Sequence, residues 1–256
     1  MQLLSRLIET IPDGEVLAVR IGIYWTAVVV DIAGQQSCGL CATLSSRHIH
    51  GTKQIPNIPN AGQLERSSGL DLVASLIEGS ETQRSVAMAA LNALLPKLPQ
   101  LWQETNAEKI IEKHGAGRRV AIVGHFPFVD RLRSKVGELA VLEQHPGPSD
   151  IPAEEAPRII PFAEVVAITG MTLVNHTLSN ILELCSPDAK VILMGPSTPL
   201  SPILFDYGID ILSGAVVTDI KPVLNVIVQG GNFRQIHRAG VRLVNIHGSQ
   251  VSGRES

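Results

Sequence analysis

The chain has 256 residues, of which 45% are hydrophobic, so it can bury a substantial core as one large domain or two modest ones. Its 21 basic and 24 acidic residues are intermixed and leave a net charge of -3, which argues against a nucleic-acid partner. No apolar run reaches the roughly 18 residues of a membrane-spanning helix, and three cysteines favour a reducing compartment over a disulfide scaffold. We therefore expect a globular, cytoplasmic protein.

The first third of the chain predicts a small antiparallel sheet. An amphipathic helix opens the chain, and three short β-favouring runs follow it closely, at 15–23, at 27–33 and around 39–44. Strands separated by so few residues are typical of an antiparallel meander. Residues 45–68 then contain several Pro, Asn and Gly residues with little periodicity. This predicts an irregular connection of a length that is often functional.

Two helices are expected after this connection. Ser68 is placed to cap the first of them, and Ser80 or Thr82 is placed to begin a second helix that is apolar on nearly all sides. A proline-containing stretch then ends the second helix and forms a natural boundary. We therefore predict a first domain over residues 1–98 and a second domain over residues 99–256.

Strand-like and helical runs alternate in the second domain, with helices expected near Ala107 to His114 and near Val129 to Val136. This alternation predicts βαβ units and a parallel sheet. Three strand-like runs are apolar at every position and lead into a glycine, as is typical of strands covered on both faces. Ligands bind beyond the carboxyl ends of such strands, so Gly124, Gly170 and Gly195 mark the expected ligand site. The prolines between Gln144 and Pro161 predict an irregular surface excursion that could cover this site. The predicted fold class is α/β, with a small α+β domain before a parallel-sheet domain.

The first strand-end turn carries a histidine. A dinucleotide-binding turn needs three glycines, whereas Gly124 is followed by His125, Phe126 and Pro127. Glu143 ends the next strand at about the distance at which an acidic residue binds ribose hydroxyls, which favours a nucleoside-like ligand over a nicotinamide dinucleotide. His125 is the candidate for proton transfer. The alternatives are a structural histidine and a Glu143 that is simply solvated.

The second and third turns supply polar side chains. Thr172 is placed to cap a helix whose free N–H groups could bind an anionic ligand group, and Asn175 follows one turn later. The alternative is that these two residues only satisfy the start of the helix. In the third turn, prolines stiffen the backbone around Ser197 and Thr198, whose hydroxyls could bind a ligand with little ordering entropy.

A cysteine pair followed by a histidine pair is a candidate metal-binding pattern, formed by Cys38, Cys41, His48 and His50. Zinc sites use Cys-x-x-Cys, but His-x-His is an unusual spacing for the second pair. If residues 38–44 form a strand, the two thiols point to opposite faces and cannot bind one ion. Small buried cysteines are the preferred interpretation, so no metal ligand is assigned.

Four segments resemble the putative heavy-metal chelation family: GLCATL at 39–44, VGHFP at 123–127, ITGMTLVNHT at 168–177 and GPSTPLSP at 195–202. The resemblance implies an enolase N-terminal-like domain followed by a Rossmann-like domain, with a ligand site in the cleft between them. It also implies a role with small molecules that chelate metals or resemble pterins and flavins. The implied site residues are Gly124, His125, Phe126, Pro127, Thr169, Gly170, Thr172, Asn175, Gly195, Pro196, Ser197 and Thr198, with Thr43 from the first domain.

The leading hypothesis is an enzyme that acts on a small heterocyclic or metal-chelating molecule by condensation or hydrolysis. His125 is its expected acid or base, Glu143 is expected to bind a polyol or ribose, and the cofactor is unknown. A second hypothesis is a non-enzymatic protein that binds a metal chelate, because no recognisable catalytic set is present. A third is direct metal binding through the Cys-x-x-Cys and His-x-His pairs. A homo-oligomer is compatible with all three hypotheses.

Overall fold

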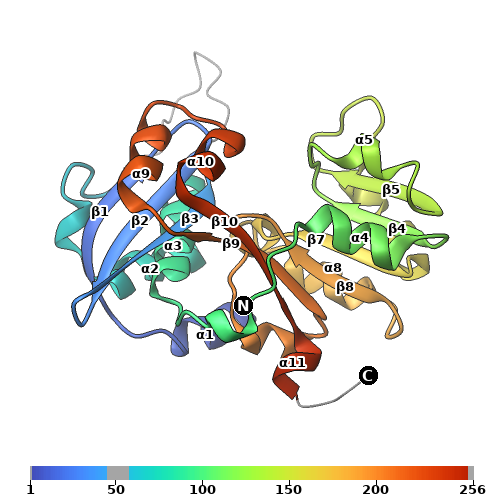
Figure 1. The fold of residues 1–256 in the computed structure, drawn as a ribbon, viewed down its shortest axis with the longest axis horizontal. Coiled ribbons are helices and arrows are strands. Elements are labelled where there is room, and N and C mark those ends of the chain that lie inside the picture. Colours follow the sequence, from blue (N-terminus) through green and yellow to red (C-terminus); the bar gives the residue numbers. More distant parts are fainter. Residues whose placement is uncertain (1, 45–57, 253–256) are drawn as a thin grey trace. The chain divides into compact units, whose positions relative to one another are not determined.

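A computed structural model describes residues 2–44 and 58–252 of the chain (Figure 1). Most of the predicted irregular connection at 45–68 therefore lies outside the described residues. The fold is of the predicted α/β class: a small antiparallel sheet precedes a larger, mostly parallel sheet with helices. Within the described ranges, no helix combines the length and apolar character that crossing a bilayer requires.

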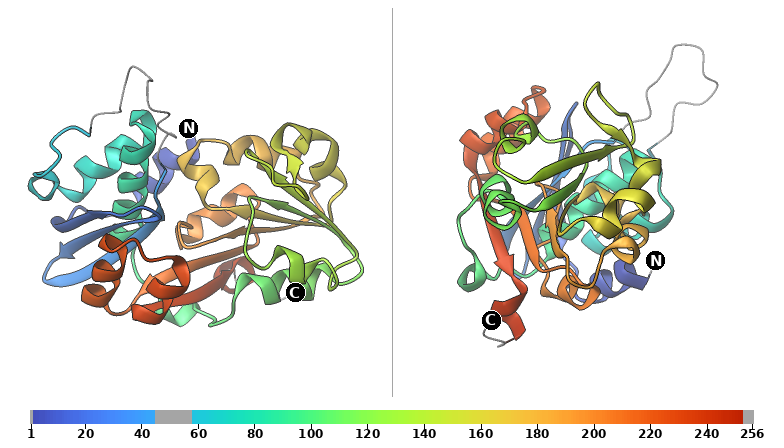
Figure 2. Two further views of the ribbon diagram at one scale, coloured as in Figure 1. Left: turned by 90° about the horizontal axis from the view of Figure 1, so that it is seen from above. Right: turned by 90° about the vertical axis from the view of Figure 1, so that its right-hand side faces the viewer.

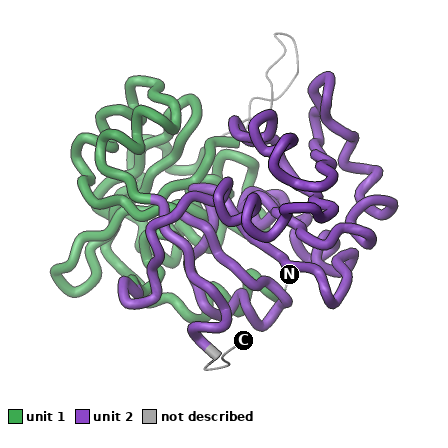
Figure 3. Tube along the Cα trace, turned by 45° about the vertical axis from the view of Figure 1, so that its right-hand side comes forward, with its two compact units in different colours: residues 1–97, 215–242 green, residues 98–214, 243–256 purple. Residues whose placement is uncertain are grey.

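The chain forms two compact units (Figure 3). The first unit is built from residues 1–97 together with 215–242, and the second from residues 98–214 together with 243–256. The sequence interpretation kept residues 99–256 in one domain, whereas 215–242 belong here to the first unit. The chain therefore passes between the units at three points.

The first unit is a small antiparallel sheet with helices on both faces. Its elements are α1 (Gln2–Glu9), β1 (Glu15–Ile21), β2 (Trp25–Ile32), β3 (Gln35–Ala42), η1 (Leu64–Arg66), α2 (Gly69–Glu78), α3 (Glu81–Leu94), α9 (Ile220–Val228) and α10 (Phe233–Gly240). The strands form the predicted meander, in the order β1-β2-β3. Ser68 caps α2 as predicted, and of the two alternatives for α3 the cap is Ser80. Both caps are capping boxes, because the residue three positions later bonds back to the cap.

Residues 215–242 join the first unit because they cover one face of its sheet. Helices α9 and α10 place Val223, Ile227 and Ile236 in one buried cluster with sheet residues that include Val29 and Leu40. The opposite face of the sheet is covered by α3, which lies so close to β3 that a Cβ on Gly39 would be 2.1 Å from the carbonyl oxygen of Ala89. Burial of apolar side chains on both faces holds this unit together.

The second unit is a larger sheet with the strand order β10-β9-β8-β7-β4-β5-β6. Its strands are β4 (Arg119–Val123), β5 (Glu138–Glu143), β6 (Ile151–Pro152), β7 (Val165–Thr169), β8 (Lys190–Met194), β9 (Ile211–Val217) and β10 (Val241–His247). The pairs from β9 to β6 are parallel, as predicted. The N–H of Gly248 binds the carbonyl of Asp210, so the end of β10 lies beside the start of β9. Strand β10 is therefore an antiparallel edge strand.

Helices cover both faces of the larger sheet (Figure 2). The helices of this unit are η2 (Pro99–Leu101), α4 (Ala107–Gly115), α5 (Val129–Leu132), η3 (Ala153–Glu155), α6 (Ala156–Ile159), η4 (Ile160–Phe162), α7 (Met171–Val174), α8 (Leu178–Leu184), η5 (Pro202–Tyr207) and α11 (Gly248–Ser252). Ile111 of α4 packs in one cluster with Ile122 and Ala167. The neighbouring strand residues Ala121 and Val166 point to the other face and are also buried. This double burial explains the apolar runs in the sequence.

Two local expectations about the second unit are wrong. The stretch between Gln144 and Pro161 is not wholly irregular, because it contains β6, η3 and α6. Three of its prolines, Pro152, Pro157 and Pro161, lie in β6 and in the first positions of α6 and η4, where the missing N–H is tolerated. The helix expected from Val129 to Val136 ends at Leu132.

Truncation of Ile227 tests the assignment of residues 215–242 to the first unit. The side chain is 1% exposed, so Ile227→Ala is expected to lower the free energy of unfolding by about 3 kcal/mol through lost burial and a cavity. The adjacent Val228 is 53% exposed, so Val228→Ala is the matched control, with an effect below about 0.5 kcal/mol. Urea denaturation measures both variants. Equal losses would contradict the packing of α9 on the sheet.

Candidate functional site

The turn after β4 is fixed to the neighbouring strand by backbone hydrogen bonds. The N–H of Gly124 donates to the carbonyl of Leu142 at 2.8 Å, and the N–H of His125 donates to Glu143 Oε2 at 2.8 Å. Gly124 has a φ of +100°, which glycine adopts without strain. Glu143 Oε1 accepts from the N–H of Gln144 at 2.7 Å. Both carboxylate oxygens of Glu143 therefore bind backbone donors, and they hold His125 at the strand end.

The imidazole of His125 binds a buried carboxylate that the sequence interpretation did not identify. Nδ1 of His125 lies 2.9 Å from Asp150 Oδ1 and 3.0 Å from Oδ2. The Asp150 side chain is only 4% exposed, whereas that of His125 is 46% exposed. The N–H of Gly147 donates to Asp150 Oδ2 at 3.0 Å, and Arg133 donates to the carbonyl of Ser149. This set of contacts gives the exposed ring a fixed, buried partner.

The pKa of Asp150 lies below its ordinary value. Burial is the largest single influence and raises the pKa, but it is outweighed by several opposing contributions, among them hydrogen bonds from the Gly147 N–H and from His125. The positive charges of His125 and Arg133 act in the same direction. Asp150 is therefore a carboxylate at neutral pH. The one signal in the sequence was a carboxylate in the proline-rich excursion directly after a strand end.

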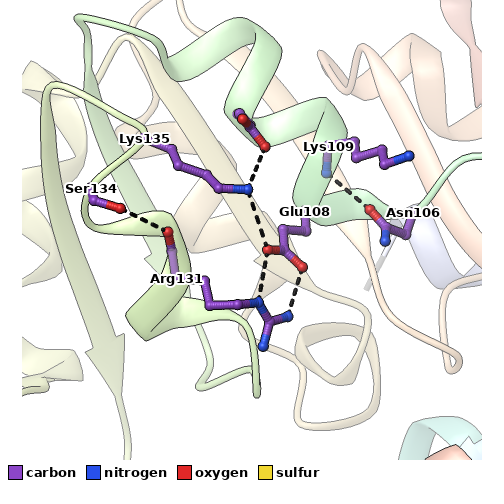
Figure 4. A network of polar contacts seen from close by, with 7 residues as sticks. Asn106, Glu108, Lys109, Arg131, Ser134 and Lys135 are labelled. Carbon is purple, nitrogen blue, oxygen red and sulfur yellow. Dashed lines mark hydrogen bonds and ion pairs between the residues drawn. The ribbon is translucent and has the colours of Figure 1, made fainter.

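An ion-pair network joins α4 and α5, the helices that precede and follow β4 in the sequence (Figure 4). Glu108 of α4 accepts from Arg131 Nε at 3.1 Å and from Nη2 at 2.8 Å, which is a bidentate pair. Lys135 lies 3.8 Å from Glu108 Oε1 and donates to Glu112 Oε2 at 2.8 Å. Arginine and glutamate thus hold α5 and the loop after it on α4. Because α5 directly follows the His125 turn, the network also supports the candidate site.

The three strand-end turns meet, as the sequence predicted for one sheet edge. A Cβ on Gly124 would lie 3.5 Å from Phe126 Cε2, and a Cβ on Gly195 would lie 3.7 Å from Cε1 of the same ring. A Cβ on Gly170 would lie 2.7 Å from Thr198 Oγ1. The space over each glycine is thus occupied by a side chain of this protein. The glycines allow the turns to pack on each other at least as much as they leave room for a ligand.

The expected cap at Thr172 is wrong. Helix α7 begins one residue earlier, and the Thr172 hydroxyl donates to the carbonyl of Thr169 at 2.7 Å inside the turn. The single helix predicted here is divided into α7 and α8, because His176 adopts a φ of +63° between them. Asn175 Oδ1 accepts from the hydroxyl of Thr177 at 2.6 Å and supports this break. Thr172 and Asn175 therefore have structural roles, which leaves a ligand role for them as a prediction.

The remaining predicted residues of the second unit differ in accessibility. Ser197 and Thr198 are buried, at 3% and 2% exposure. Within the described ranges, Thr198 Oγ1 has no hydrogen-bond partner, which is unusual for a buried hydroxyl. Pro127 is exposed and Pro196 is half-buried. A ligand at this edge would therefore meet the outer side of the turns first.

The first unit contains one predicted site residue and two hollows. Thr43 directly follows β3, and its hydroxyl lies 2.9 Å from that of Thr26. The hollows have volumes of about 310 and 330 Å³, and Ile58 and Leu64 line both. Neither hollow includes a candidate strand-end residue. The strand ends are therefore a candidate site because of the arrangement of their side chains and not because of a hollow. The ligand-binding role of Thr43 stays a prediction.

The two cysteines of the candidate metal pattern lie on β3 and are buried. They are three positions apart on a strand, so their thiols point to opposite faces. Burial raises the pKa of the Cys38 thiol to about 12, although the charge of Lys97 opposes the shift. His48 and His50 lie outside the described residues. Among residues 2–44 and 58–252, no three His, Cys, Asp or Glu side chains are grouped as metal ligands.

Comparisons with known proteins identify the family. A family model described as putative heavy-metal chelation matches residues 106–245, over half of the chain, and a second model with the same description matches residues 4–95. The chain belongs to the putative heavy-metal chelation family. This finding confirms the resemblance that the sequence motifs indicated.

Relatives of this family share the fold across nearly the whole chain. An uncharacterized protein from Methanocaldococcus jannaschii is 25% identical in an alignment over 233 residues that covers 86% of this chain and 86% of its own. A crystal structure from Desulfitobacterium hafniense has a TM-score of 0.75 at 24% identity and covers 96% of this chain and 98% of its own. One from Pyrococcus horikoshii has a TM-score of 0.77 at 20% identity, covering 95% and 97%. Both crystallised proteins are of unknown function, so they support the fold alone.

Two histidines of the second unit, one in the last turn of α4 and one at the end of β10, predict how stability depends on pH. His114 and His247 have lowered pKa values, mainly because of burial and also because of the charges of Lys113 and Lys190. The unfolded chain binds protons at the ordinary pKa of about 6.5, and the folded protein binds them only at lower pH. The stabilising contribution is therefore complete above this value. It is expected to be lost progressively as the pH falls below about 6.5, where the unfolded chain binds protons and the folded protein does not.

Urea denaturation across this pH range checks the expectation. The double variant His114→Gln, His247→Gln should show a smaller decline in the free energy of unfolding than the wild type. His145→Gln, which changes an exposed histidine, is the control and should leave the decline unchanged. A decline of the same size in all three proteins would assign the effect to other groups.

Proposed function

We propose that the strand-end edge of the second unit is the active site of an enzyme that acts on a small molecule, with His125 as the proton-transfer group. The observation that carries this proposal is the contact of an exposed imidazole with a buried, ionised carboxylate at 2.9 Å. Within the described residues, Nε2 of His125 has no hydrogen-bond partner. A ring held through Nδ1 and open at Nε2 is suited to general acid or base catalysis.

The surrounding groups favour a small polar ligand. Thr169 ends β7 and packs against Gly124 in the turn that carries His125, and Asn175 follows at the end of α7. Each Glu143 oxygen accepts one backbone donor and retains a second lone pair, so a ribose or polyol hydroxyl can still donate to it. The family description, putative heavy-metal chelation, supports a metal-chelating ligand, which the resemblance implied beside pterin-like ligands, while Glu143 suggested a nucleoside-like one. Condensation or hydrolysis is the proposed reaction.

A second candidate is a protein that binds a metal chelate without transforming it. The described cysteines favour this candidate in one respect, because burial raises the pKa of Cys185 to about 11 and that of Cys38 higher still. Thiols with such pKa values are poor nucleophiles at neutral pH. Direct metal binding through Cys38 and Cys41 together is not favoured, since these thiols point to opposite faces of β3.

Thermal-shift screening with pterins, nucleosides and metal chelates, followed by mass spectrometry of the stabilising ligand, tests the proposal. We expect a ligand that stabilises the protein and is converted to product. His125→Ala should lower kcat by about 100-fold or more, the usual contribution of a proton-transfer group. His145→Ala is the matched control, because this exposed histidine lies in the same region and should have no effect. A ligand that binds but is never converted would support the binding protein instead.

A further inference from the structure

We infer that Asp150 is a positioning residue that keeps the neutral His125 ring protonated on Nδ1, so that Nε2 starts the reaction as a base. The first part of this inference concerns the free protein and stands by itself. The second part rests on the proposed function. Together they narrow the reaction to one that begins with removal of a proton from the ligand or from a bound water.

The geometry sets the position of the ring proton. Both Asp150 oxygens lie within 3.0 Å of Nδ1, and an ionised carboxylate can only accept hydrogen bonds. The hydrogen between these atoms must therefore belong to Nδ1. A neutral imidazole carries one ring proton, so its lone pair is on Nε2. That nitrogen belongs to a side chain that is 46% exposed.

Neither partner of the pair needs a ligand to hold it in place. On one side, the backbone of His125 is bound to Glu143 at the end of β5. On the other, Asp150 lies in a turn in which its own N–H binds the carbonyl of Gly147 at 3.1 Å. Arg133 binds that turn through the Ser149 carbonyl at 3.1 Å. Such preorganisation from both sides is what a positioned base requires.

The proton balance of the step is complete within the pair and its ligand. Nε2 forms a bond to the proton. The electron pair of the broken bond stays on the ligand atom, or on the water oxygen, that carried the proton. The resulting imidazolium is stabilised by the Asp150 carboxylate through the same Nδ1–H contact. In hydrolysis, Nε2 then returns the proton to the leaving group. No redox partner or further reactant is needed.

Asparagine at position 150 provides a sharp test of this inference. In Asp150→Asn, the Gly147 N–H still needs an acceptor, so the amide oxygen should take the place of Oδ2. The amide NH₂ then faces Nδ1, which must become an acceptor. His125 should consequently change to the tautomer with its proton on Nε2, and the basic lone pair would be lost from the exposed nitrogen.

Imidazole nitrogen NMR of the full-length protein labelled with ¹⁵N-histidine measures the tautomer without any ligand. We expect His125 to carry its proton on Nδ1 in the wild type and on Nε2 in Asp150→Asn. The signal of the exposed His145 should be the same in both proteins. A wild-type His125 protonated on Nε2 overturns the inference, and so does a tautomer that Asp150→Asn leaves unchanged. If the variant does not fold, the wild-type tautomer alone decides.

Turnover separates this inference from the proposed function. Once a converted ligand is known, Asp150→Asn should lower kcat by about 100-fold or more with little change in KM, because the base is lost but binding is not. If the tautomer is as expected and no ligand is ever converted, the enzyme proposal fails while the positioning role of Asp150 stands. If turnover occurs and is unaffected by Asp150→Asn, Nε2 is not the base.

Discussion

The candidate site depends on hydrogen bonds that continue the β4–β5 ladder past the end of the strand. The Gly124 N–H binds the Leu142 carbonyl, and the next N–H, that of His125, binds the Glu143 side chain in place of a backbone carbonyl. The left-handed conformation of Gly124 makes this continuation possible, because other residues adopt it only with strain. A side chain on a free loop would sample many orientations, whereas this histidine starts from a backbone as ordered as the sheet.

A buried carboxylate connects stability with chemistry in this unit. Removing Asp150 from water is unfavourable unless hydrogen bonds and charges compensate for it, and His125, Gly147 and Arg133 supply that compensation. The same contacts that make burial tolerable also orient the imidazole. The α4–α5 ion pairs additionally hold the helix that directly follows the His125 turn. The site is therefore part of the folded framework of the sheet rather than an addition to it.

Periodicity and composition in the sequence were sufficient to predict the α/β class, the antiparallel meander and the parallel order of the second sheet. Apolar runs predict the strands of this sheet reliably, because strands that are buried on both faces have no polar face. Ser68 could be predicted as a helix cap because a capping box is a local sequence pattern. Asp150 could not be found in this way. Its contact with His125 spans 25 residues and depends on how a proline-rich turn folds back over a strand end.

The division between α7 and α8 was missed for a different reason. Its cause is a single positive φ at His176, whereas the apolar residues Val174, Leu178 and Ile181 continue across the break with helical spacing. The assignment of residues 215–242 to the first unit could not be predicted either. The strands of the small sheet and the helices that cover one of its faces are far apart in the sequence. The first miss is a local backbone feature that side-chain periodicity does not report, and in the second, packing between distant segments decides the assignment.

That distant packing constrains how such a gene can evolve. The two family models match residues 4–95 and 106–245 separately, as if the halves were independent modules. Yet the second half carries α9 and α10, the layer that shields Ala27, Val29 and Leu40 in the first. A gene fission or recombination event between the halves would leave one product with an uncovered apolar face, prone to aggregation. Selection should therefore keep the two halves linked in one reading frame, even where their functions could be separated.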